Sequence, residues 1–161
     1  ALSSAASDVY KRQVIFGYAL LAPTSKMYIS LRQRTERIET AYTYAKKSYD
    51  DGGQDIHYKA SLTLSIICCA ISEHEKGQDK INECRLAIRY ANEAVFSDFY
   101  QQNNTSLQLD LDAKQGKSHS GIQMVVNACN FIKQNSTDME DVEISESVLD
   151  RLHKLSLEKN S

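Results

Sequence analysis

Histidine and cysteine are the side chains most often used as metal ligands or activated nucleophiles, and this chain has four of each. No histidine stands in an H-E-x-x-H motif, and no two cysteines have the C-x-x-C spacing of zinc or redox sites. We expect the cysteines to be small buried thiols in a reducing compartment. The sequence therefore predicts no metal centre and no cofactor. The residues concerned are His57, His74, His119 and His153, with Cys68, Cys69, Cys84 and Cys129.

Motifs that position a nucleophile or a phosphate are missing as well. The sequence contains no G-x-S-x-G, no G-x-G-x-x-G and no G-x-x-x-x-G-K-[ST]. Its paired carboxylates, Asp50-Asp51 and Glu140-Asp141, fall in predicted loops, where we expect them to be solvated. We also expect a solvated turn at Glu73-His74-Glu75, at the end of a predicted helix. We therefore expect that the chain is not an enzyme.

Charge and hydropathy argue against two further classes of partner. The formal net charge is -2, whereas nucleic-acid-binding domains usually carry a basic excess. The basic residues between Arg32 and Lys47 alternate with Glu36 and Glu39, as on an ordinary exposed helix face. No apolar run approaches the roughly 20 residues that span a bilayer, and no secretory signal is apparent. We expect a cytoplasmic protein that binds neither nucleic acid nor membranes.

Helix breakers are scarce, since the 161 residues include one proline and six glycines. Apolar positions at helical spacing predict helices over residues 26–49, 56–75, 79–98 and 118–133. Gly52-Gly53 and Gly77 should end two of these helices, and Asp55 and Asp79 should cap the helices that follow. Residues 62–71 are apolar nearly all round, which is typical of a central buried helix. The predicted fold is an all-α antiparallel stack of about five main helices.

The two ends of the sequence differ in character from the part between them. Residues 1–13 resemble a translated sequencing adapter, so we interpret them as a non-native or disordered leader. Residues 14–133 form the predicted helical domain. Residues 134–161 form an acidic tail with an amphipathic pattern at Ile144, Val148, Leu152 and Leu155. Either this tail folds back as a short helix that competes with a partner, or it is disordered.

Three stretches carry a recognisable pattern. Residues 84–95 read C-R-L-A-I-R-Y-A-N-E-A-V, and residues 123–132 read Q-M-V-V-N-A-C-N-F-I. Upstream, Ala41-Tyr42 precedes His57, and Leu62-Thr-Leu64 follows. In this order the stretches resemble the C-terminal half of the 14-3-3 family of phosphopeptide-binding adaptors. The first is similar to that family's C-x-L-A-x-x-A-F-D-E-A-I helix. The resemblance covers roughly residues 14–133.

This resemblance implies a particular architecture and function. The family forms an α-α superhelix whose concave groove holds an extended phosphoserine or phosphothreonine segment through arginine, lysine and asparagine side chains. The helices used for dimerisation and for most of the phosphate-binding cations would lie upstream of this sequence. A complete chain would then be a dimer through that missing half. The implied role is a signalling adaptor that binds protein or peptide segments.

Several of the family's groove residues are replaced in this chain. The two asparagine positions match Ile67 (or Ile66 without a one-residue shift) and Ala128, the tryptophan matches Ile132, and the phosphate-contacting arginine matches Ala19. We therefore predict a degenerate groove that binds phosphopeptides poorly and prefers apolar or unphosphorylated segments. Its apolar wall is predicted to consist of Ile66, Ile67, Ala70, Met124, Ala128 and Ile132. The alternative is a tetratricopeptide-like or other helical-repeat scaffold that binds peptides independently of phosphate.

Overall fold

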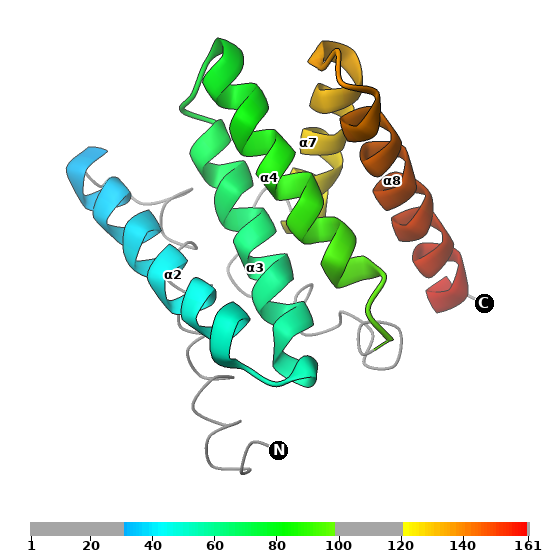
Figure 1. The fold of residues 1–161 in the computed structure, drawn as a ribbon, viewed down its shortest axis with the longest axis horizontal. Coiled ribbons are helices and arrows are strands. Elements are labelled where there is room, and N and C mark those ends of the chain that lie inside the picture. Colours follow the sequence, from blue (N-terminus) through cyan, green and yellow to red (C-terminus); the bar gives the residue numbers. More distant parts are fainter. Residues whose placement is uncertain (1–30, 99–120, 161) are drawn as a thin grey trace.

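The computed structural model describes residues 31–98 and 121–160, and this part of the chain is all-α, as the sequence predicts. Each described helix runs in the opposite direction to the next described one and packs beside it (Figure 1). None of the described helices has an apolar stretch long enough to cross a bilayer. The predicted leader at residues 1–13 and Ala19, the position matched to the phosphate-contacting arginine, lie outside the described residues. The helices are α2 (Leu31–Asp51), α3 (Gln54–Ser72), α4 (Gly77–Val95), α7 (Gly121–Asn135) and α8 (Met139–Asn160).

The break between α2 and α3 is made by the predicted glycine pair. The amide of Gly52 donates to the carbonyl of Ser48 at 2.9 Å, and a Cβ on Gly52 would lie 2.4 Å from that same oxygen. Only glycine therefore fits there without a shift of the backbone. The prediction that Asp55 caps the next helix was wrong. Helix α3 starts at Gln54 with Gly53 as its N-cap residue, which places Asp55 inside the first turn.

The break between α3 and α4 also contains the predicted glycine. Gly77 has a φ of +57°, in the left-handed region that residues other than glycine and asparagine rarely adopt. Helix α4 begins at Gly77 with Lys76 as its N-cap residue. Asp79 is therefore a first-turn residue rather than the predicted cap, although its charge is favourable near the positive end of the helix dipole. The exposed turn expected at His74 is confirmed.

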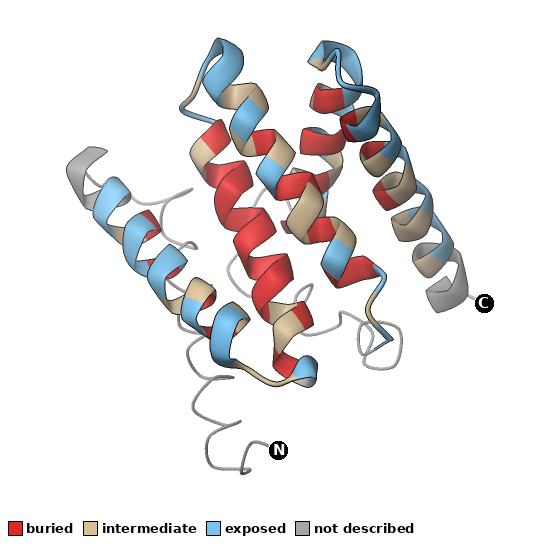
Figure 2. Cartoon of the chain, in the orientation of Figure 1, coloured by how far each residue is buried: buried red, intermediate tan, exposed pale blue. Residues whose placement is uncertain are grey.

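Helix α3 is the centre of the molecule, and every residue from 60 to 70 is buried (Figure 2). It packs against α2, α4 and α7, which explains why its sequence is apolar nearly all round. Two serines within this stretch donate across the interface to α4. Ser65 Oγ donates to the carbonyl of Ala87 and Ser61 Oγ to that of Tyr90, both at 2.7 Å. These hydrogen bonds satisfy hydroxyls that would otherwise be costly to bury.

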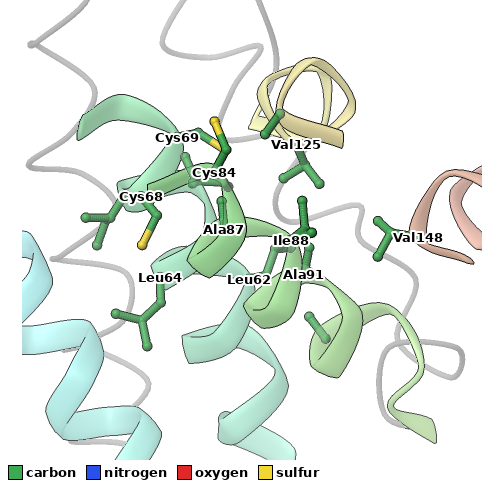
Figure 3. Close-up of a cluster of buried hydrophobic side chains, with 14 of the residues drawn as sticks. Leu62, Leu64, Cys68, Cys69, Cys84, Ala87, Ile88, Ala91, Val125 and Val148 are labelled. Carbon is green, nitrogen blue, oxygen red and sulfur yellow. The ribbon is translucent and has the colours of Figure 1, made fainter. Parts of the chain in front are cut away.

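The acidic tail forms a longer helix than the short one expected. Helix α8 has 22 residues and packs against α4 and α7, and its Val148 belongs to the same hydrophobic core as α3 (Figure 3). The disordered alternative is therefore wrong for residues 139–160. The link from α7 is three residues long, from 136 to 138. It ends in Asp138, whose Oδ1 accepts from the amide of Glu140 at 3.0 Å and so caps the helix.

Candidate functional site: an arginine pair covered by helix α8

The six positions predicted to line an apolar groove lie on α3 and α7, and the structure brings these two helices into contact. The thiol of Cys69 on α3 approaches the carbonyl oxygen of Met124 on α7 at 3.6 Å. Of the six side chains, only Met124 is partly exposed; the other five, each at most 5% exposed, are Ile66, Ile67, Ala70, Ala128 and Ile132.

Packing around the central helix explains this burial. Since α3 is covered on the sides of α2, α4 and α7, its isoleucines contribute to the interior rather than to an open surface. In the structure, these positions are core residues. Their role as a partner-binding groove stays a prediction. A partner could reach the buried positions on α3 only by displacing one of the helices that pack on it.

Sequence reasoning missed a polar cluster between α4 and α8. Arg85 and Arg89 stand one turn apart on α4, and both reach the carboxylate of Asp141 near the start of α8. Arg85 Nε donates to Asp141 Oδ2 at 2.7 Å. Arg89 Nη1 lies 2.8 Å from Oδ1, close enough for an ion pair although its N–H is not aligned as a hydrogen bond. The Ser136 hydroxyl, in the link before α8, donates to Oδ2 at 3.1 Å.

The Asp141 carboxylate is fully buried, while the two arginine side chains that hold it are 35% and 36% exposed. Burial by itself raises the pKa of the carboxyl, but the interactions with Arg89, Arg85 and Ser136 outweigh it and leave the pKa below its ordinary value.

Asp50 and Asp51 are exposed, as expected, but they end α2 rather than lying in a loop. The prediction that Glu140-Asp141 is a solvated loop pair was also wrong, because both residues lie in the first turn of α8 and Asp141 is buried. The physical reason is that the arginines compensate a charge that could not otherwise leave water.

The seam beyond this cluster is narrow and only partly apolar. Asp141, Ser145 and Val148 follow one another at helical spacing on α8, and all three are 0% exposed. Figure 3 shows Val148 reaching from α8 toward the side of α4 that carries Ile88 and Ala91. The hydroxyl of Ser145 has no hydrogen-bond partner among the described residues. A buried hydroxyl left unpaired costs about 1–3 kcal/mol, so the seam is not optimised for stability.

A second polar contact holds α8 further along. Arg151 Nε donates to the carbonyl of Val95 at the end of α4, at 3.2 Å. The guanidinium carbon of Arg151 also lies 5.7 Å from the centre of the Phe96 ring, which is 48% exposed. Helix α8 is thus held by arginine contacts in its first turn, at Asp141, and past its middle, at Arg151, and Val148 is the fully buried apolar side chain between them.

The residues with the most familiar catalytic chemistry form a different cluster at the junction of α2, α3 and α4. Glu93 accepts a hydrogen bond from the hydroxyl of Tyr49 at 2.6 Å, and His57 Nε2 lies 3.6 Å from the same carboxylate oxygen. The imidazole of His57 also stacks on the Tyr49 ring, with the ring centres 4.2 Å apart. Burial and the bond to Glu93 raise the pKa of Tyr49, which keeps the phenol protonated.

In this second cluster the described contacts do not pair a serine with the histidine. Its serine, Ser61, donates to the carbonyl of Tyr90 at 2.7 Å and lies 3.3 Å from the Glu93 carboxylate oxygen, rather than donating to the imidazole of His57. The contacts instead join three helices, α2, α3 and α4. We interpret the cluster as a structural junction.

The cysteines behave as the sequence predicts in their burial and their free state. Burial raises the pKa of Cys68 and of Cys129 to about 12, and it also raises the pKa of Cys69 and Cys84. Since the thiolate is the reactive form, all four side chains are poor nucleophiles in the folded protein. Within the described ranges, no group of three or more His, Cys, Asp or Glu side chains could hold a metal ion.

The comparisons with known proteins supply no relative: no family model, no curated protein and no solved structure matches the chain. The resemblance to the 14-3-3 family therefore rests on the sequence stretches alone.

Proposed function

We propose that the chain is a protein-binding adaptor that acts in the cytoplasm and takes a segment of another protein onto its helical stack. It is proposed to resemble the 14-3-3 family in this role, with the polar clamps of that family's groove replaced by aliphatic side chains. One observation carries the proposal. The face formed by α4 and α7 already holds an amphipathic helix, α8, through a carboxylate bound to two arginines and a thin apolar seam.

That combination is the chemistry by which helical scaffolds take partner helices. An apolar strip supplies affinity, and a charged contact fixes the register. The strip beneath α8 includes Ile88, Ala91 and Val125, which belong to the molecule's core. A face that recognises a helix from its own chain is chemically equipped to recognise one of the same pattern from another.

Recognition of phosphate is expected to be weak at the positions that the resemblance assigns to the groove. Each hydrogen bond that an asparagine or arginine would make there is worth about 0.5–3 kcal/mol. The six predicted wall residues carry no polar group that could replace these hydrogen bonds. The competing hypothesis is a tetratricopeptide-like or other helical-repeat scaffold. It also predicts peptide binding that does not depend on phosphate, but it requires a repeated sequence unit.

The test is a binding titration with the full chain. A panel of fluorescent peptides would contain phosphoserine segments, their unphosphorylated twins and unrelated amphipathic helices. We expect micromolar binding of some members, with less than about a tenfold preference for phosphate, or about 1.4 kcal/mol. Failure of every member to bind would overturn the adaptor role, and a preference for phosphate of about a hundredfold would overturn the degenerate groove.

A matched pair of methionines tests the position of the groove. Met124 is partly buried against the core, whereas Met139 is 68% exposed. Met124→Ala should weaken binding of the peptides that the chain takes up, and Met139→Ala should leave it unchanged. Equal effects of both substitutions would remove Met124 from the groove.

A further inference from the structure

We infer that the α4–α7 face is a binding site for an acidic amphipathic helix of a partner protein, that Arg85 and Arg89 read one carboxylate of that helix, and that α8 is the resident occupant that the partner must displace. This inference rests on the proposed function and adds the chemistry of the partner and the regulation of the site. The contacts of α8 carry it.

The arginine pair is suited to a carboxylate ligand. Arg85 and Arg89 are spaced by four residues, so their side chains leave the same face of α4. Each guanidinium is a planar donor that matches a carboxylate, and the two together hold both oxygens of Asp141. Since each arginine remains about one third exposed, the pair stays accessible from outside when α8 leaves. Two adjacent cations without a counter-charge then favour an anionic replacement.

Helix α8 buries fewer apolar side chains than α4 and α7 do, among the residues whose burial is described. Helix α4 buries six side chains: Cys84, Ala87, Ile88, Ala91, Ala94 and Val95. Among residues 139–155 of α8, whose burial is described, a single apolar residue is completely buried, Val148; Ile144, Leu149, Leu152 and Leu155 pack on the core but stay partly exposed. Helix α8 also buries the unpaired hydroxyl of Ser145. Helices with few buried apolar contacts are the ones that open locally without unfolding the rest.

The residues that α8 turns toward α4 and α7 predict the pattern of the partner. The helix presents a carboxylate at position 141, a small residue four positions later and an aliphatic residue seven positions later, and all three are buried. Ile144, Leu149, Leu152 and Leu155 continue the apolar side and pack on the core. A partner helix should therefore carry Asp or Glu followed by a small residue at +4 and aliphatic residues at +3, +7, +8, +11 and +14. The partner segment is a helix of this acidic pattern.

The experiment uses the full chain and a fluorescent synthetic peptide with the sequence of residues 138–160. Asp141→Asn in the protein should loosen the resident helix and leave the arginine pair free. We expect this variant to bind the peptide about tenfold or more tightly than the unsubstituted chain. Asp150→Asn is the matched control, because Asp150 lies on the same helix, is 63% exposed and pairs only with Lys154 among the described residues. It should behave like the unsubstituted chain.

Peptide variants test what the arginines read. A peptide with Asn in place of its Asp at position 141 should bind the Asp141→Asn chain about 10- to 100-fold more weakly, as expected when a charge-assisted hydrogen bond is removed. Adding Arg85→Gln and Arg89→Gln to the Asp141→Asn chain should abolish this difference, whereas adding Arg37→Gln on α2 should not. Circular dichroism of each variant is the control that its helices remain folded. The arginines are replaced in the Asp141→Asn chain because its Asn is neutral. In the unsubstituted chain, the same replacements would leave the buried Asp141 carboxylate without its arginine partners.

Four results would overturn the inference. Equal binding of the Asp and Asn peptides would reduce the arginine pair to a structural ion pair. Equal binding of the peptide by the Asp141→Asn and unsubstituted chains would mean that α8 does not compete. A phosphoserine peptide that binds more than about tenfold tighter than the Asp peptide would assign the site to phosphate. Dimerisation of the Asp141→Asn chain in sedimentation would assign it to a second copy of α8.

The inference and the proposed function can fail separately. If the Asp141→Asn chain ignores the α8 peptide while members of the unrelated panel still bind, the inference fails and the adaptor role stands. If no peptide of either set binds, the adaptor role itself fails.

Discussion

At the scale of single residues, Asp141 determines how α8 is attached. Its charge is removed from water completely and compensated by Arg85, Arg89 and the Ser136 hydroxyl. Because the pKa of this carboxyl in the folded chain lies below its ordinary value of 3.8, the folded state favours the ionised form. Its contribution to stability is therefore present above that ordinary value and is lost as the pH falls through the lowered pKa.

Asp141→Asn should lower the free energy of unfolding by about 1–3 kcal/mol at neutral pH. The difference from the unsubstituted chain should be constant above about pH 5 and should shrink below about pH 4, as the carboxyl of the unsubstituted chain becomes protonated. Urea unfolding of both chains at a series of pH values measures this difference in the free energy of unfolding. Asp150→Asn, on the exposed side of α8, should show no such dependence. A difference that persisted unchanged at pH 2 would contradict the ion-pair assignment.

Ser145→Ala should stabilise the chain by about 1 kcal/mol, because it removes a buried hydroxyl without a described partner and adds a better helix former. Ser147→Ala is the control, since Ser147 lies on the same helix but is partly exposed. It should give only the smaller gain from helix propensity. Thermal unfolding compares the two. A loss of stability in Ser145→Ala would mean that the hydroxyl is satisfied after all.

The buried thiols were predictable from sequence, but the arginine pair was not. Cys68 and Cys69 stand in a continuous apolar stretch, a local signal that indicates burial directly. Arg85 and Asp141 are 56 positions apart, and no local pattern joins them. Glu140-Asp141 therefore reads as an ordinary acidic loop until α4 and α8 are placed side by side.

At the scale of the elements, glycines mark the breaks between helices more reliably than aspartates mark where helices begin. Gly52-Gly53 follows the end of α2 directly, as predicted, whereas α3 ends at Ser72 and Gly77, expected to end it, is the first residue of α4. The predicted caps at Asp55 and Asp79 were each displaced into the first turn. Helix starts depend on hydrogen-bond geometry that composition specifies only within a few residues.

Two glycine substitutions should separate steric from conformational cost. Gly52→Ala forces a Cβ toward the carbonyl oxygen of Ser48, so the backbone must shift. At Gly77 there is open space, and alanine suffers only the left-handed φ, which costs about 1 kcal/mol. We expect Gly52→Ala to lower the urea midpoint more than Gly77→Ala, and Gly77→Asn to be milder still, because asparagine tolerates that backbone. The reverse order would contradict the described turn at Gly52.

At the scale of the whole molecule, stability is expected to be uneven. Helix α3 is enclosed by three others, whereas α8 packs on α4 and α7 and fully buries one apolar side chain among its residues 139–155. The fold class and central helix were predictable, since they follow from apolar periodicity. The docking of α8 could not be predicted, because it depends on tertiary pairing between arginines and one carboxylate.

Hydrogen exchange should show this unevenness directly. Backbone amides of α8 should exchange faster than those of α3, because local opening of α8 exposes less apolar surface. Asp141→Asn should accelerate exchange in α8 alone. Uniform exchange across both helices would show that α8 opens only when the whole chain unfolds.

The three-residue link between α7 and α8 has a further consequence for any competitor. Because the link is so short, α8 stays close to the α4–α7 face after it dissociates. It rebinds with an effective concentration of about millimolar. A partner helix with only modest intrinsic affinity could not displace α8 at this effective concentration. The length of the link therefore sets the minimum affinity that a partner needs. Lengthening it with glycine and serine inserted before Ser136 would lower this threshold and leave the contacts of Arg85 and Arg89 with Asp141 in place.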